Sequence, residues 1–171
     1  MQDIERQAQK KGVKLERLGR CQFCGSHTEH GVFECFEIFN FMASGAVGLS
    51  QFIYADAHCL QHSEVHGTWN NNFHLTRMYL TLEKKINWAY SKTSHLSSTL
   101  DKYKSSHAEA LIPALPRLER DQTTITDLKG LKRSEFDTAL LRWAHDVYES
   151  YAHYHPIAKA VGDLYIQNFE K

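Results

Sequence analysis

A set of cysteines and a histidine that can share one metal ion constrains the fold most, because one ion would tie distant segments together. The stretch CQFC places Cys21 and Cys24 on one turn, and a third cysteine follows at Cys35. The stretch DAHCLQH, residues 56–62, ends in His62. Two thiolates on a tight turn can point at a single ion, and a structural zinc is bound by four such ligands. Cys21, Cys24, Cys35 and His62 are therefore the predicted Zn²⁺ ligands.

The neighbours of His62 leave the fourth ligand open. His58 and Cys59 lie four and three residues before His62, so a helix would place either of them on the face of His62. Exchanging His62 for Cys59 gives a site of four thiolates. The plainer interpretations are that Cys35 and Cys59 are small core residues, and that His58 and His66 are exposed or structural.

Disulfide and redox chemistry are less consistent with the sequence. The first twelve residues, MQDIERQAQKKG, contain no apolar segment, and no window holds the roughly 20 apolar residues of a membrane span. We therefore expect a cytoplasmic protein, whose four cysteines are kept as thiols or metal ligands. A thioredoxin-type pair follows a strand in a βαβ pattern, and nothing before Cys21 indicates a strand.

The charge balance argues against nucleic acid and membrane partners. Twenty basic and twenty acidic residues cancel, so the chain has no global field to attract polyanions. The mild basic excess lies in residues 1–20, which are predicted to form an N-terminal arm or helix. A length of 171 residues fits one domain. Residues 21–171 are predicted to be a single helical, zinc-binding domain.

Apolar residues recur at helical spacing, and no stretch alternates with a period of two, so the predicted fold is a compact, mainly α domain with a zinc-bound cysteine turn. A first helix starts at Val32 and is interrupted at residues 44–48. A second runs from an N-cap at Ser50 to Gly67. The third is expected to be capped by one of the asparagines 70–72.

The second half of the chain divides into two regions. Residues 91–130 are rich in serine and threonine and are predicted to be mostly extended, with a short helix starting near Thr126. Residues 134–169 carry apolar and aromatic side chains at three- and four-residue intervals, which predicts a long amphipathic helix. Pro156 is expected to bend or restart that helix.

This order of features resembles a family of small, mostly bacterial proteins described as a domain of unknown function. Its pattern is a Cys-x2-Cys-Gly start, a later cysteine, a segment like Asp-x-Tyr-x-Leu-Gln-His-Pro, a His-Leu pair and a tryptophan-rich C-terminal helix. The matching residues are Cys21, Cys24, Gly25, Cys35, Asp56, Leu60, Gln61, His62, His74, Leu75, the stretch TTITDL, Trp143, Ala144, Val147, Tyr151, His155 and Val161. His58 replaces the family's tyrosine and Ser63 its proline, which puts the turn after His62 in doubt. The resemblance implies a site and leaves the activity open.

The sequence supports a main hypothesis and an alternative, and leaves open whether the chain is an enzyme. In the first, zinc is structural and the protein is a module that binds a protein or small molecule, with aromatic helices that could form a homo-oligomer. In the second, a metal-dependent hydrolase or transferase uses a cluster of histidines and a carboxylate near the metal. Asp56 and Gln61 are expected to orient His62 through hydrogen bonds. His74 and His155 are the further candidates, unless they merely cap a helix and precede a proline kink.

Overall fold

A computed structural model describes residues 2–43, 49–108, 111–115 and 123–170. Helices make up nearly all the regular structure in these ranges. Within these ranges there are eight α-helices and no β-strand, only an isolated bridge between Gly19 and His30. The predicted mainly α fold is confirmed. The helices are α1 (Gln2–Lys11), α2 (Gly31–Ala43), α3 (Leu49–Gln61), α4 (Ser63–His66), α5 (Thr68–Met78), α6 (Tyr90–Ser106), α7 (Arg133–Ser150) and α8 (His155–Phe169).

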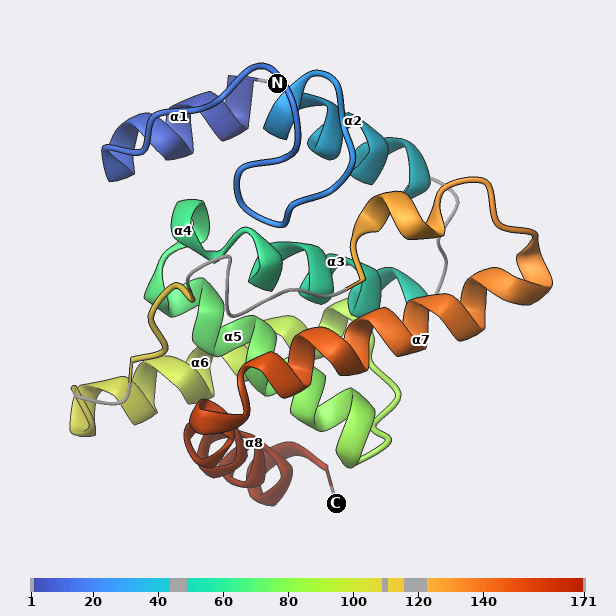
Figure 1. The fold of residues 1–171 in the computed structure, drawn as a ribbon. Helices are drawn as coiled ribbons and strands as arrows, with labels where there is room; N and C mark the ends of the chain where they lie inside the picture. The colour runs from blue at the N-terminus through green and yellow to red at the C-terminus, as the bar shows by residue number, and fades with distance from the viewer. Residues whose placement is uncertain (1, 44–48, 109–110, 116–122, 171) are drawn as a thin grey trace.

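Helix α3 lies in the middle of the molecule (Figure 1). It packs against α5 and α7, while α5 and α6 pack against α8 on the far side. The loop that carries the cysteine pair lies with α1 and α2 above α3, and α1 also contacts α4. None of the helices in the described ranges has the length and apolar character needed to cross a membrane.

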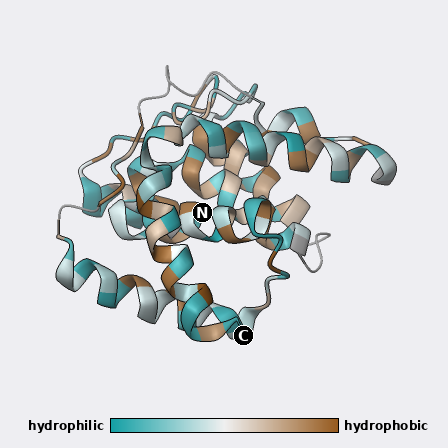
Figure 2. Cartoon of the chain, turned by 90° about the horizontal axis from the view of Figure 1, so that it is seen from below, coloured by the Kyte–Doolittle hydropathy of each residue, from teal (hydrophilic) through white to brown (hydrophobic). Residues whose placement is uncertain are grey.

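The core forms where the apolar faces of these helices meet. Hydrophobic and hydrophilic residues alternate along the helices (Figure 2), as expected when each buries one face. On α7 the buried residues follow at three- and four-residue intervals: Leu140, Trp143, Ala144, Val147, Tyr148 and, just after the helix, Tyr151. The ring of Trp143 meets that of Tyr54 from α3 edge to face, at 5.7 Å between centroids. Large aromatic side chains thus fix α7 against α3.

The long C-terminal helix breaks where it was predicted to break. Helix α7 ends at Ser150, a short 3₁₀ turn spans Ala152–Tyr154, and α8 starts with Pro156 in its first turn. Proline is tolerated there because the first helical N–H groups have no partner within the helix.

The helix predicted for residues 50–67 is two helices. It begins at Leu49 and ends at Gln61, and α4 follows after His62. The amide N–H of His62 lies 3.1 Å from the carbonyl oxygens of both His58 and Cys59, a shared bond typical of a helix end. The interruption predicted at residues 44–48 lies outside the described residues.

The predicted asparagine cap is wrong, because α5 starts at Thr68 and both buried asparagines lie inside it. The side chain of Asn72 accepts a hydrogen bond from the amide of Ile112 at 2.7 Å, and the side chain of Asn71 donates to its carbonyl oxygen at 3.1 Å. These amide groups therefore hold the non-helical segment 111–115 against α5.

The extended conformation predicted for residues 91–130 is also wrong in its first part, where α6 forms. Leu96 and Leu100, one turn apart, are buried, and the hydroxyls of Ser97 and Thr99 donate to carbonyl oxygens one turn earlier. Tertiary burial thus overrides the weak helix propensity of serine and threonine. The short helix predicted near Thr126 is confirmed as a 3₁₀ turn, Ile125–Leu128.

Candidate metal centre

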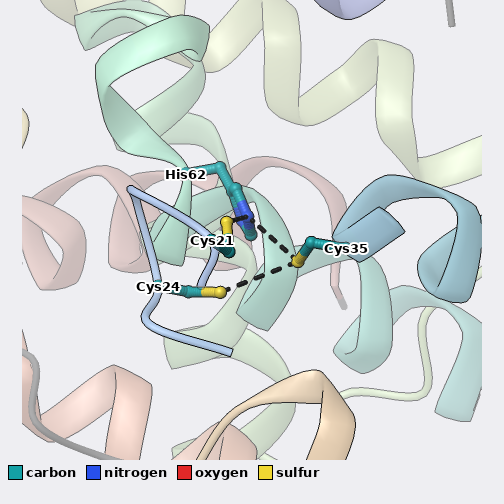
Figure 3. Close-up of side chains that lie close together, drawn as sticks. All are labelled: Cys21, Cys24, Cys35 and His62. Carbon is teal, nitrogen blue, oxygen red and sulfur yellow. Dashed lines mark hydrogen bonds between the residues drawn. The ribbon is translucent and has the colours of Figure 1, made fainter. Parts of the chain in front are cut away.

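The cysteine pair lies on a tight turn that precedes α2. The amide of Gly25 donates to the carbonyl oxygen of Cys21 at 2.9 Å, and the amide of Cys21 donates to the carbonyl oxygen of Ser26 at 3.1 Å. Gly25 has a φ of 79°, which favours glycine because a Cβ would clash with the backbone. The turn points both cysteine side chains into the molecule (Figure 3).

The structure brings the four predicted ligands together from three segments. Cys35 comes from the first turn and a half of α2, and His62 from the junction of α3 and α4 (Figure 3). The ligand atoms of Cys21, Cys24, Cys35 and His62 all lie within 4.8 Å of one another.

Three of the distances between these atoms fit a tetrahedral zinc site. His62 Nε2 lies 3.4 Å from the Sγ atoms of both Cys21 and Cys35, and the Sγ atoms of Cys24 and Cys35 are 3.7 Å apart. Zn–S bonds of about 2.3 Å and Zn–N bonds of about 2.0 Å at tetrahedral angles give S···S of about 3.8 Å and S···N of about 3.5 Å. A disulfide would need about 2.05 Å between sulfurs, so the cysteines are free thiols.

The cluster is shielded from solvent. Cys21, Cys35 and His62 are 0% exposed and Cys24 is 5% exposed. The rings of Phe23 and Phe36 meet the ring of His62 edge to face, at 5.7 and 5.1 Å between centroids. A polar donor set of this kind is expensive to bury unless its members are paired or bind a cation.

A backbone hydrogen bond sets the orientation of His62. Its Nδ1 donates to the carbonyl oxygen of His58 at 2.7 Å, which leaves the lone pair of Nε2 for the sulfur side of the cluster. The prediction that Asp56 or Gln61 orients His62 is corrected accordingly. A carbonyl one turn back on the same helix already occupies Nδ1.

The side chain of His58 packs beside the cluster without joining the four-ligand group. Its ring is stacked between Phe39 and His62, at 4.1 and 4.0 Å between centroids, and its Nε2 lies 3.8 Å from the sulfur of Cys35. Burial, reinforced by the charge of His62, holds the pKa of His58 well below its usual range. His58 is therefore a buried, neutral ring, which agrees with the structural role expected from the sequence.

The thiols and the imidazole share protons. Hydrogen bonding from Cys21 and Cys35 lowers the pKa of Cys24 well below its usual value. Hydrogen bonding with Cys21 and Cys24 raises the pKa of Cys35. Burial opposes a charge on His62, but the neighbouring thiolates of Cys24 and Cys21 outweigh it and raise its pKa. The hydroxyl of Ser26, 3.0 Å from the sulfur of Cys24, adds a further donor. The cluster thus concentrates negative charge where a cation would bind.

Asp56 and His74 lie close together and are hydrogen-bonded to each other. Asp56 is fully buried and its carboxylate binds the guanidinium of Arg77 at 2.6 to 3.0 Å. His74, which lies inside α5 and does not cap it, donates from Nδ1 to Asp56 at 2.7 Å.

Gln61 and His155 make contacts elsewhere. Gln61 accepts a hydrogen bond from the Trp143 indole at 3.1 Å and donates to the carbonyl oxygen of Thr123 at 2.9 Å. His155 stacks on Tyr148 and donates to its carbonyl oxygen at 2.9 Å, just before the proline of α8 as expected.

Arg77 and Ser26 are the functional-site residues that sequence reasoning missed. Arg77 follows His74 by three residues, so a helix places both on one face, and this spacing beside a buried carboxylate could have signalled the pair. Ser26 follows Cys24 by two residues on the same turn, which could have marked it as a donor to the thiolate.

The comparison with protein families covers most of the chain. No match was found among curated proteins or solved structures. A family model described as "Family of unknown function (DUF5946)" matches residues 19–152, which include all four clustered ligands. Since that match spans well over half of the sequence, the chain belongs to the family of unknown function DUF5946.

Proposed function

We propose that this protein binds one structural Zn²⁺ through Cys21, Cys24, Cys35 and His62 and acts as an interaction module. The observation that carries the proposal is a complete, buried donor set, three thiols and one imidazole, at the spacing of a tetrahedral site. Thiolate-rich sets of four are typical of structural zinc. A reducing compartment such as the cytoplasm would keep the three thiols available to the metal.

The metal would join three segments of the chain that are distant in the sequence. Residues 12–30 contain turns and one isolated bridge but no helix. A zinc ion bound by this loop, α2 and the end of α3 would tie the loop to the helical core. In small zinc domains such binding contributes about 10 to 16 kcal/mol at neutral pH, which is enough to decide whether the segment folds.

The alternative, a metal-dependent hydrolase or transferase, has less support. A catalytic zinc keeps one coordination position for water or substrate, whereas four protein ligands fill a tetrahedral sphere. Asp56 and His74 are engaged with each other and with Arg77, and His155 is engaged with Tyr148. These contacts leave no described carboxylate–histidine pair aimed at the cluster.

A groove along α2 suggests the chemistry of the partner. It is a cavity of about 510 Å³ along α2, where Ile38 and Met42 form an apolar floor and Phe41 is 80% exposed. Glu29, Glu34 and Glu37 line the same groove, together with His30 and Lys129. We assign this surface to a protein segment with an apolar anchor and flanking lysine or arginine residues, because such a segment matches both the apolar floor and the carboxylates.

Metal analysis tests the zinc proposal directly. Protein purified without added metal is expected to contain one zinc per chain, and a strong chelator is expected to lower its melting temperature by more than about 10 °C. Cys24→Ser should lose the zinc, whereas the matched variant Cys59→Ser should keep it. Metal-free protein with an unchanged melting temperature in chelator would contradict the proposal.

Short fluorescent peptides test the partner chemistry. A peptide with leucine and phenylalanine anchors flanked by lysines should bind the zinc-loaded protein, and its affinity should fall as salt is raised. The same anchors flanked by glutamates should not bind, and Phe41→Ser should abolish binding of the lysine peptide. Equal binding of the two peptides, or binding of neither, would reject this surface.

A further inference from the structure

The groove along α2 that is assigned to a protein partner is built from three segments of the chain. Its apolar floor, Ile38 and Met42, belongs to α2. Residues 29–30, which follow the cysteine turn, and residues 129–130, which follow the 3₁₀ turn, also line it. The shape of the groove therefore depends on how these three segments are held together.

The floor of the groove starts one helical turn after a metal ligand. Cys35 and Ile38 are three residues apart on α2, so they lie on the same side of that helix, and both are buried. Glu34, which also lines the groove, directly precedes Cys35. A movement of α2 that displaces the Cys35 sulfur would therefore also displace the floor.

One side of the groove is attached both to α2 and to the cysteine loop. The amides of Glu29 and His30 donate to the Glu34 carboxylate at 2.7 and 3.1 Å. The amide of Gly19, which lies shortly before Cys21, donates to the carbonyl oxygen of Glu29 at 2.8 Å. These bonds connect this side of the groove to the loop that carries two of the four ligands.

Residues 129–130 are also connected to the cysteine loop. They follow the 3₁₀ turn Ile125–Leu128, which packs against α2 (Figure 1). In that turn the hydroxyl oxygen of Thr126 accepts a hydrogen bond from the amide of His27, on the loop just after Cys24, at 3.3 Å. The cysteine loop thus links the metal centre to the 3₁₀ turn.

We propose that zinc binding at Cys21, Cys24, Cys35 and His62 controls the groove, so that the protein recognises a basic segment with an apolar anchor in its zinc-loaded form and loses this ability with the metal. This inference rests on the proposed function, because it uses the same metal and the same groove. The ion joins the cysteine loop to α2 and thereby sets the positions of all three segments.

Loss of the ion would loosen the groove for an electrostatic reason. Thiolates that no cation neutralises repel one another, so the cysteine loop and α2 would no longer be held in one arrangement. Only a fraction of the chains would then present the complete groove. The apparent affinity for the partner falls in proportion to that fraction.

Thermodynamic linkage makes this control reciprocal. If zinc raises the affinity for the partner by a given factor, the partner raises the affinity for zinc by the same factor. Couplings of this kind typically amount to about 5- to 150-fold. The protein would therefore hold zinc most tightly when the partner is bound.

The fluorescent peptide with lysine-flanked anchors measures the coupling on the full-length protein. Its affinity is expected to fall at least about tenfold when a chelator removes the zinc, and to recover when zinc is added back. Saturating peptide should raise the zinc affinity, measured by competition with a chromophoric chelator, by the same factor.

The possible failures are distinguishable. Equal peptide affinity with and without zinc, or a zinc affinity that the peptide leaves unchanged, overturns the coupling while zinc binding and the groove stand. Zinc-loaded protein that binds no peptide rejects the groove itself and the coupling with it.

Amide hydrogen exchange separates a loosened groove from a loss of the whole fold. When zinc is removed, the amides of residues 19–43 should exchange faster, while those of α7 and α8 stay protected. A uniform loss of protection would mean that zinc merely maintains the fold, and would overturn its specific control of the groove.

Thr126→Val tests the connection without changing a ligand or a residue that lines the groove. The variant loses the acceptor for the His27 amide, so the zinc-loaded protein should keep its metal and bind the peptide at least about threefold more weakly. Thr123→Val is the matched control, because the Thr123 hydroxyl donates to Asp146 on α7, and its peptide affinity should equal that of the parent. Unchanged affinity in Thr126→Val would overturn the proposed connection.

Discussion

His62 donates a 2.7 Å hydrogen bond from Nδ1 to the carbonyl oxygen of His58, one turn earlier on the same helix. The bond leaves Nε2 at 3.4 Å from two cysteine sulfurs. A main-chain atom thus performs the orienting role that carboxylates perform in many zinc sites. The side chain of His58 instead stacks on the ring of His62.

Separate substitutions of His62 and His58 distinguish the metal ligand from its packing partner. His62→Gln is expected to abolish stoichiometric zinc, because it removes the nitrogen ligand. His58→Phe should retain zinc, since the carbonyl oxygen remains and a phenyl ring can stack on Phe39. Elemental analysis and thermal melting check both variants. Equal loss of zinc in the two would mean that the His58 ring is itself required at the metal.

Zinc affinity should rise with pH across the neutral range. The raised pKa values of His62 and Cys35 mean that the metal-free cluster holds protons that must leave when zinc binds. Each proton released makes the affinity about tenfold higher per pH unit below the relevant pKa. Competition with a chromophoric chelator at pH 6, 7 and 8 measures the slope, and calorimetry in two buffers measures the proton release. An affinity independent of pH would contradict these directions.

Replacing one member of the Asp56–Arg77 pair should destabilise the protein more than replacing both members. Both side chains are buried, and the guanidinium also lies 5.0 Å from the ring centre of Phe73. Asp56→Asn leaves a buried cation without its partner, which costs about 3 to 5 kcal/mol of stability. Asp56→Asn with Arg77→Met should recover part of that loss. Urea unfolding of the zinc-loaded variants measures it, and simple additivity would show that the pair is not coupled.

Asn72→Leu should loosen the segment 111–115. The substitution keeps the number of side-chain heavy atoms but leaves the buried amide of Ile112 without an acceptor, which costs about 1 to 3 kcal/mol. Proteolysis is expected to begin near Ile112 while the zinc content stays unchanged. Ser105→Ala, which removes an exposed hydroxyl, serves as the control. Resistance to protease equal to that of the parent would show that Asn72 is not what holds the segment.

Local pattern determined the helical class and the donor chemistry of the candidate metal site. Apolar spacing predicted the C-terminal helix and Pro156 its break, since the signals involved lie within a few residues of each other. Cysteine and histidine spacing selected four residues that lie together, because few other side chains offer soft donors.

Only the tertiary structure decided the partners of the remaining polar residues. The sequence suggests that Asn72 caps a helix, and only the structure shows its partner, which lies 40 residues away. The sequence suggests that Asp56 is a partner for His62, but in the structure Asp56 binds Arg77 from helix α5. Local propensity acts over a few residues, whereas buried polar groups pair with whatever the packing of α3 against α5 brings within reach.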